Sequence, residues 1–244
     1  MKQLRLHWKK VFGALALGLV LLMVAGWQLS RSRDYQLLGE IVPRVDIDKK
    51  LVALTFDDGP TPGFTEEILT TLKTHQVPAT FFVTGKDLAK HPELGKKIVR
   101  AGHELGNHSF SHKRMVFTPY DKVRQELEAT EDLIKQAGQN EPIFFRPPYT
   151  KKLFNLPLYL WLNQVVSITT DVEPDSYPEV AASADNIADY VAAEVQPGSI
   201  VLLHVMYPSR ATSMAAVPGI IQKLRQQGYE FVTVRDLLAE RQRA

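Results

Sequence analysis

The 244-residue sequence contains no cysteine. This absence excludes disulfide bonds, thiolate metal ligands, a cysteine nucleophile and a lipid anchor attached through cysteine. A chain without cysteine is compatible with an oxidising compartment but does not prove one. The sequence also has no internal repeat and no low-complexity segment. Its length and composition are those of one globular α/β domain with an appendage.

The net positive charge of the chain comes from its N-terminal segment. The chain has 29 lysines and arginines and 27 acids, for a formal net charge of +2. Six of those basic side chains, but only one acid, lie in residues 1–34, so the remainder carries a net charge of −3. A basic footprint for nucleic acid is therefore absent, and we expect no nucleic-acid partner.

Residues 11–27 form an uncharged apolar run, VFGALALGLVLLMVAGW. Such a run is at the short end of what crosses a bilayer as a helix. More positive charge precedes it than follows it, which predicts a cytoplasmic N-terminus and an extracytoplasmic chain after residue 30. A cleaved signal peptide is the alternative, because the run is short and ends near the small pair Ala25-Gly26. We favour an uncleaved anchor, with Trp8 and Trp27 at the two interfaces, because no clear Ala-x-Ala site is present.

After a weakly patterned spacer at residues 31–50, short β-rich runs alternate with helical patterns. Strands are expected at residues 51–56, 79–85, 103–108, 143–146, 164–170, 199–204 and 231–234. Helices are expected at residues 64–75, 92–102, 120–137, 184–195, 218–227 and 234–243. This alternation predicts an α/β fold, with a mostly parallel sheet or barrel and its chemistry at the carboxyl ends of the strands. The expected organisation is an anchor or signal peptide (1–30), a spacer (31–50) and one globular domain (51–244).

The stretch LVALTFDDGP at residues 51–60 is typical of a buried strand that delivers two acids to a loop. Asp57 and Asp58 stand at its end, before a Gly-Pro turn. Two adjacent carboxylates at a buried strand end repel each other unless a cation or a shared proton lies between them. The pair therefore predicts a metal site.

The stretch HSFSH follows the third expected strand and holds His108 and His112. Histidines four residues apart lie on the same side of one helical turn, so both can reach one ion. This spacing alone is weak, and two surface or capping histidines are the alternative. With Asp58 as a third, anionic ligand, the set is typical of a catalytic metal site with one open position.

Three further clusters stand at the ends of expected strands. In FRPPY, two prolines stiffen the chain beside Arg146, which would keep a nearby carboxylate ionised, although an ordinary loop arginine is the alternative. The stretch TDVEPDSY, residues 170–177, carries three acids and could equally be a solvated loop. The stretch GSIVLLH ends at His204. A lone histidine is more often structural, but barrel strands converge on one mouth, and this favours a functional role.

All five clusters stand in the order found in the polysaccharide deacetylase family, carbohydrate esterase family 4, and the sequence resembles that family from Leu51 to Leu238. TFDDGP and HSFSH match its first two motifs in full. The resemblance implies a distorted (β/α) barrel of the NodB-homology type, with fewer complete strands than a TIM barrel. Here that barrel would be preceded by one N-terminal transmembrane helix. It also implies a hydrolase that removes acetyl groups from a polysaccharide.

The resemblance implies roles for individual residues by their positions. Asp57 matches the catalytic base, and His204 matches the catalytic acid. Asp58, His108 and His112 match the ligands of one divalent metal. Zn²⁺ is the expected ion, although two imidazoles and a carboxylate also accept Co²⁺, Ni²⁺, Fe²⁺ or Mn²⁺.

Supporting roles follow from the same resemblance. Arg146 would orient the base, the backbone N–H of Tyr149 would help to hold the oxyanion, and Leu202 would form a wall of the acetyl pocket. Asp171 most resembles the acid that tunes His204, with Asp175 as the alternative. The family usually has a tryptophan after the second acid of this motif, whereas here the pocket position falls to Tyr177. Thr150 and Val205 are further departures from the family pattern.

The expected substrate is an acetylated polysaccharide outside the cytoplasm. A membrane-anchored, extracytoplasmic deacetylase most naturally meets peptidoglycan or an exported N-acetylhexosamine polymer. The enzyme would be secreted if the N-terminal segment is cleaved. Two alternatives stay open: an esterase that removes O-acetyl groups from xylan or another glycan, and a membrane-anchored glycan-binding protein without turnover.

Overall fold

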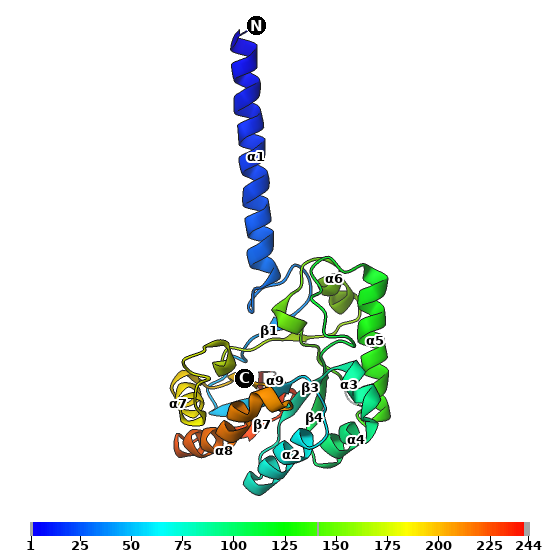
Figure 1. The fold of residues 1–244 in the computed structure, drawn as a ribbon, viewed down its shortest axis with the longest axis vertical. Helices are drawn as coiled ribbons and strands as arrows, with labels where there is room; N and C mark the ends of the chain where they lie inside the picture. The colour runs from blue at the N-terminus through cyan, green and yellow to red at the C-terminus, as the bar shows by residue number, and fades with distance from the viewer. Residues whose placement is uncertain (1, 141, 242–244) are drawn as a thin grey trace.

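The computed structural model describes residues 2–140 and 142–241, which form a long N-terminal helix and an α/β domain (Figure 1). Helix α1, Lys2–Ser30, projects away from the domain along most of its length. Its segment Lys10–Ser30 has a mean hydropathy of 2.0, and its apolar window is not buried against the domain. A single helix of this kind is typical of both a membrane span and a signal sequence.

The domain is built on a parallel five-stranded sheet. Strands β4 (Glu104–Asn107), β3 (Thr80–Val83), β2 (Leu51–Asp57) and β6 (Ile200–Leu203) are neighbours in that order. Strand β7 (Glu230–Val232) pairs with the first half of β2. A separate parallel pair joins β1 (Ile41–Val42) to β5 (Ser167–Ile168). All the carboxyl ends of the main sheet therefore lie at one edge.

Single-residue pairings close the two sheets into a ring. Phe145 bridges to Asn107 of β4 on one side and to Ser167 of β5 on the other. Beyond β5, Val172 bridges to Val201 of β6. The distorted α/β barrel that the sequence predicted is confirmed, with isolated bridges where a complete barrel would have strands.

Helices cover the outside of the ring (Figure 1). They are α2 (Phe64–His75), α3 (Gly85–Lys90), α4 (Pro92–Arg100), α5 (Tyr120–Gln136), α6 (Asn155–Leu162), α7 (Ala184–Glu194), α8 (Ala211–Gln226) and α9 (Val234–Arg241). Their buried positions follow the helical period: α5, for example, buries Val123, Leu127, Thr130 and Ile134. The N-terminus of α7 is capped by Ser183, whose hydroxyl accepts a hydrogen bond from the N–H of Asn186.

Strand β2 lies at the centre of the core and is buried on both faces. Val52, Leu54 and Phe56 join the larger apolar cluster, while Ala53, between them, joins a second one. This explains why the strand is almost continuously apolar rather than alternating. The strand ends at Asp57, so this carboxylate arrives at the carboxyl edge of the sheet.

Several expected boundaries were wrong. The predicted strand at residues 143–146 is reduced to the bridge at Phe145, because Pro147 and Pro148 have no N–H with which to continue a ladder. Helix α8 begins at Ala211 rather than at Pro218, which lies inside it. Helices α3 and α6 were not expected, and β1 lies in the predicted spacer.

Candidate active site

The carboxyl ends of β2, β4 and β6 bring the predicted polar clusters together. Asp57 ends β2, His108 follows β4, and His204 follows β6. They open into a cleft of about 470 Å³, lined by Asp57, Asp58, Thr84, Lys86, His108, His112, Arg146, Pro147, Tyr149, Thr150, Thr169, Thr170, Glu173, Asp175, Ser176, Leu202, His204, Tyr207 and Arg210. A larger hollow of about 810 Å³ lies between α2 and α4, away from all the predicted site residues. The chemistry belongs to the smaller cleft, because the buried titratable groups converge there.

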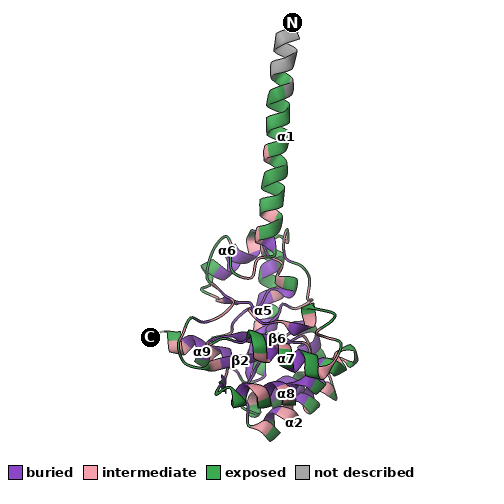
Figure 2. Cartoon of the chain, turned by 90° about the vertical axis from the view of Figure 1, so that its left-hand side faces the viewer, coloured by how far each residue is buried: buried purple, intermediate pink, exposed green. Residues whose placement is uncertain are grey.

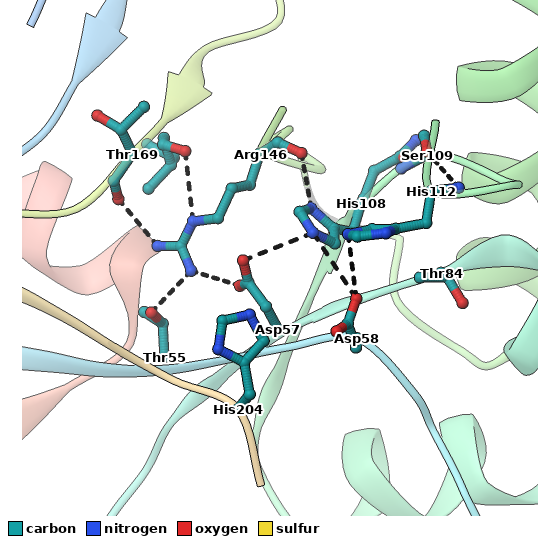
Figure 3. A network of polar contacts seen from close by, with 12 residues as sticks. Thr55, Asp57, Asp58, Thr84, His108, Ser109, His112, Arg146, Thr169 and His204 are labelled. Atoms are coloured by element: carbon teal, nitrogen blue, oxygen red, sulfur yellow. Dashed lines mark hydrogen bonds and ion pairs between the residues drawn. The ribbon is translucent and has the colours of Figure 1, made fainter. Parts of the chain in front are cut away.

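Asp58, His108 and His112 form a compact cluster of potential metal ligands. One donor atom from each lies within 4.8 Å of the other two. The Asp58 Oδ1 atom is 3.3 Å from His112 Nε2 and 4.0 Å from His108 Nε2 (Figure 3). The structure thus brings together all three residues that the sequence proposed as ligands.

The expected helical turn at His108–His112 is wrong. This segment is a loop, in which Ser109 and His112 adopt left-handed conformations with φ of 64° and 58°. Two hydrogen bonds hold the loop: the Ser109 N–H donates to Asn107 Oδ1 (2.9 Å), and the His112 N–H donates to Ser109 Oγ (3.1 Å). The two imidazoles therefore meet because of local side-chain bonding.

The protonation of the two imidazoles suits a cation. The carbonyl of Arg146 lies 2.8 Å from His108 Nδ1 and can only accept, so Nδ1 carries the proton and Nε2 presents its lone pair. Burial lowers the pKa of His112, which favours its neutral form. Two neutral nitrogens and one carboxylate oxygen fit a first-row divalent cation such as Zn²⁺.

Asp57 and Arg146 form a buried ion pair beside this cluster. The Arg146 Nη1–H group donates to Asp57 Oδ1 at 2.6 Å, and both side chains are almost fully buried. Burial alone would raise the pKa of Asp57. The positive charge of Arg146 and the hydrogen bond from its guanidinium outweigh that effect and hold the pKa below its usual value. Asp57 is therefore an ionised carboxylate that can accept a proton.

The guanidinium of Arg146 is fixed from several sides (Figure 3). Nη1 also donates to Thr55 Oγ1 (2.8 Å), and Nη2 donates to the Thr169 carbonyl (2.9 Å). Its carbon centre lies 4.0 Å from the centre of the Phe82 ring. Sequence reasoning missed Thr55 and Thr169, because their contacts with Arg146 arise only in the folded structure.

The partner of His204 is Asp175, and the expected contact with Asp171 is wrong. Asp175 Oδ2 accepts from the His204 backbone N–H (2.8 Å) and lies 3.2 Å from its Nδ1. Ser213, which the sequence did not indicate, donates from Oγ to Asp175 Oδ1 at 2.6 Å. Burial lowers the pKa of His204, but the carboxylates of Asp175, Asp57 and Asp58 more than offset this and leave it raised.

Strand register explains this correction. The bridge between Val172 and Val201 sets the 170–175 segment parallel to β6. Asp175 is three residues beyond Val172, as His204 is three residues beyond Val201, so the two come level. Asp171 lies at the opposite end of β6, where it accepts from Ser199 Oγ (2.6 Å) and the Ile200 N–H (2.8 Å). Burial raises the pKa of Asp171 despite these bonds.

Tyr149, Leu202 and Tyr177 have different positions relative to the cleft. Leu202 and Tyr149 line it. The Tyr149 backbone is left-handed, with φ of 56°, and none of the described residues accepts a hydrogen bond from its N–H. Tyr177 does not line the cleft. The short 3₁₀ turn at Pro174–Ser176 directs it against Tyr190 of α7, with ring centres 5.4 Å apart.

Comparison with known proteins places this geometry in a family. The polysaccharide deacetylase family model matches residues 44–158. A peptidoglycan-N-acetylglucosamine deacetylase from Bacillus cereus is 36% identical over 188 residues, which cover 77% of this chain and 68% of that protein. The chain belongs to the polysaccharide deacetylase family.

Two further members extend the comparison. The peptidoglycan-N-acetylmuramic acid deacetylase PdaC from Bacillus subtilis is 34% identical over 199 residues, covering 79% of this chain but only 40% of PdaC. The crystal structure of a peptidoglycan N-acetylglucosamine deacetylase, in complex with 4-naphthalen-1-yl-N-oxidanyl-benzamide, superposes with a TM-score of 0.75 at 33% identity. That match covers 80% of this chain and 90% of the other.

Proposed function

We propose that this chain is a metal-dependent hydrolase that removes N-acetyl groups from N-acetylhexosamine residues of a cell-envelope or exported polysaccharide, such as peptidoglycan or a chitin-like polymer. Family membership and the peptidoglycan deacetylases among its relatives support this reaction class. The observation that carries the proposal is a buried, ionised Asp57 between a three-ligand cluster and a protonatable His204. Amide hydrolysis needs a base, an acid and an electrophile in this arrangement.

Asp57 acts as the base when water attacks the acetyl group. It removes a proton from the water that attacks the carbonyl carbon, while Arg146 keeps it ionised between turnovers. As the carbonyl oxygen gains negative charge, the backbone N–H of Tyr149 donates to it. The apolar side chain of Leu202 lies against the acetyl methyl group.

His204 completes the reaction. It donates a proton to the amide nitrogen as the carbon–nitrogen bond breaks, and the products are acetate and a free amine. Asp175 keeps the imidazole protonated for this step and fixes its orientation through Nδ1. The proton that Asp57 removed from water replaces the one that His204 gave away, so the cycle balances.

Asp58, His108 and His112 would hold the divalent cation, and zinc is the ion that we propose. When bound, such a cation supplies a Lewis acid beside the scissile carbonyl and lowers the pKa of water. The His108 Nδ1–H bond to the Arg146 carbonyl aims the ligand nitrogen, and the left-handed backbone of Asp58, with φ of 72°, directs its carboxylate to the same side.

The experiment that tests this function measures acetate release by the full chain in detergent. Substrates are N-acetylglucosamine oligomers and peptidoglycan, and the protein is stripped of metal and then given Zn²⁺ or Co²⁺. We expect metal-dependent release that is lost in Asp58→Ala, together with bound metal measured by elemental analysis. Asp121→Ala, which removes an exposed carboxylate from α5, is the matched control and should retain both.

The outcomes separate the alternatives. A folded, metal-loaded protein that releases no acetate from these substrates would overturn N-deacetylation of them. Release from acetylated xylan in its place would identify an O-acetyl esterase. Glycan binding with no acetate release from any of these substrates would identify a binding protein without turnover.

The proposed location is extracytoplasmic. Helix α1 would be an uncleaved anchor with its N-terminus in the cytoplasm, because basic residues are more frequent before the apolar segment than after it. The catalytic domain would then face the envelope polysaccharide.

A further inference from the structure

Helix α1 is joined to the domain by residues that are themselves hydrogen-bonded to the domain. Its last residue, Ser30, is fully buried, and its carbonyl accepts from the Lys152 N–H at 3.0 Å. Two residues further on, the Ser32 carbonyl accepts from Lys152 Nζ at 2.5 Å. The Arg33 carbonyl then accepts from Thr169 Oγ1 at 2.7 Å. The apolar helix therefore passes directly into the folded domain.

The length of the apolar segment fixes where a bilayer would end. Lys10–Ser30 contains 21 residues, which as a helix span about 30 Å, the thickness of a hydrocarbon core. Ser30 would thus lie at the outer boundary of the bilayer, and so would the parts of the domain that surround it. Among these parts is the cleft rim, because Thr150 and Thr169 line the cleft and also contact Lys152 or Arg33.

Helix α6 lies at the same end of the domain as the root of α1, in both views (Figures 1 and 2). It and the segment before it expose large apolar side chains: Phe154 is 55% exposed, Trp161 54% and Leu162 56%. The adjoining linker exposes Tyr35, Leu37 and Leu38. Linker and helix touch, since a Cβ at Gly39 would meet Trp161 at 3.4 Å. Exposed apolar groups gathered in this way mark a contact surface.

Cations stand beside the same helix root. Lys151 Nζ lies 4.1 Å from the centre of the Trp27 ring, in the last turn of α1. The charges of Arg31 and Arg114 are close enough to act on Lys151. Tryptophan, tyrosine and basic residues around a helix that leaves a bilayer are typical of the headgroup layer, and cations there attract anionic lipids.

We propose that α6 with Phe154 and the linker residues 35–38 form a membrane-contact surface, which seats the domain on the outer leaflet and holds the cleft rim at the lipid headgroups. This inference rests on the anchor role proposed for α1. The site would then reach the polysaccharide next to the membrane rather than distant layers. The bilayer is favoured over a protein partner because the surface continues directly from the end of the apolar helix.

The test uses the full chain in vesicles of phosphatidylethanolamine and phosphatidylglycerol that carry a nitroxide near the headgroup. Because the chain has no cysteine, Leu162→Cys takes a fluorescent label at one position only. We expect its emission to be quenched. A label at Thr74→Cys, on α2 at the far end of the domain, should keep its emission. Leu37→Cys gives a second, independent position on the surface.

A third label, at Leu19→Cys within α1, reports insertion of the anchor through quenching by a nitroxide deep in the acyl chains. Quenching at Leu19 and at Leu162 or Leu37, but not at Thr74, supports the contact surface. Quenching at Leu19 alone overturns it, leaves the anchor standing and points to a protein partner or a second copy for the apolar face. No quenching at Leu19 overturns both, while acetate release from soluble oligomers tests the deacetylase function separately.

Discussion

Asp171 and Asp175 lie only four residues apart in the chain, yet they contact opposite ends of β6. Asp175 reaches the histidine at the carboxyl end, and Asp171 binds the backbone where the strand begins. The N–H groups that they bind, of Ile200 and His204, are four residues apart along β6, which is about 13 Å at about 3.3 Å per residue. Asp175 can therefore influence the protonation of His204, whereas Asp171 is too far from it to do so.

Asp175→Asn should shift the pH profile of acetate release. In the proposed mechanism His204 is the acid, so activity is lost as the pH rises through its pKa. Removing the Asp175 charge lowers that raised pKa, so the alkaline limb of kcat/KM moves to lower pH. At neutral pH the rate should fall by up to about 10²-fold, the lower end of general acid catalysis.

Asp171→Asn is the matched control for this change. It should leave the alkaline limb in place and cost about 1 kcal/mol of stability, because one hydrogen bond at the start of β6 is weakened. If Asp171→Asn moved the limb and Asp175→Asn did not, the assignment of the histidine partner would be wrong.

His103 is a buried titratable group away from the cleft, and its Nδ1 accepts from the Ala79 N–H at 3.2 Å. Burial lowers its pKa from 6.5 to about 4. The unfolded chain therefore takes up a proton near pH 6.5, whereas the folded chain does not until about pH 4. Between these values His103 should reduce the free energy of unfolding, by up to about 3 kcal/mol as the pH falls.

His103→Gln should remove this contribution. Urea unfolding between pH 7 and 4 should give a shallower loss of stability in the variant than in the wild type. His75→Gln, which changes a partly exposed histidine at the end of α2, should keep the wild-type slope. Equal slopes for all three proteins would rule out His103 as the source.

At the scale of elements, β6 enters the sheet through a tight approach at Gly198. This residue has φ of +82°, and a Cβ there would lie 1.7 Å from the Val45 carbonyl oxygen. The backbones of these two residues are also hydrogen-bonded, because the Val45 N–H donates to the Gly198 carbonyl at 2.9 Å. Only glycine allows the spacer and the strand to come this close.

Gly198→Ala should therefore reduce the free energy of unfolding by much more than the unfavourable φ alone would. Gly228→Ala isolates the φ cost, since its φ is +84° but the nearest atom, Lys50 Cδ, is 3.8 Å away. We expect Gly228→Ala to cost about 1–2 kcal/mol and to lower Tm by about 2–8 °C. Gly198→Ala should lower Tm well beyond this or prevent folding. Similar melting curves for the two variants would contradict the close approach.

The sequence predicted helices and strands correctly where an apolar period was bounded by glycine or proline. It failed where tertiary contacts determine the structure or the neighbours of a residue. Helix α5 was expected because apolar residues recur every three or four positions, whereas α6 is apolar on nearly every side and shows no such period. The ligand set was expected, but its loop geometry depends on Ser109. Asp171 and Tyr177 were misassigned, because their neighbours depend on register with β6 and on packing against α7.

At the scale of the whole molecule, the N-terminal helix distinguishes an anchored enzyme from a secreted one. If the segment is an anchor, we expect the chain to stay in the membrane fraction after alkaline carbonate and to leave it only in detergent, because the segment is long and apolar enough to span a bilayer. Mass spectrometry of the extracted protein should recover residues 1–26. A chain in the medium that begins beyond Gly26 would identify a cleaved signal peptide.

Arg146 serves the site through two separate parts of one residue: its guanidinium holds Asp57, and its carbonyl holds His108. A side-chain substitution removes the first link and leaves the second, whereas a shift of the loop around Phe145 breaks both. The position of residue 146 therefore affects both the proposed base, Asp57, and the proposed metal ligand, His108. A change in the backbone of that loop should disrupt the Asp57 ion pair and the orientation of His108 at the same time. Restoring the loop should restore both contacts together.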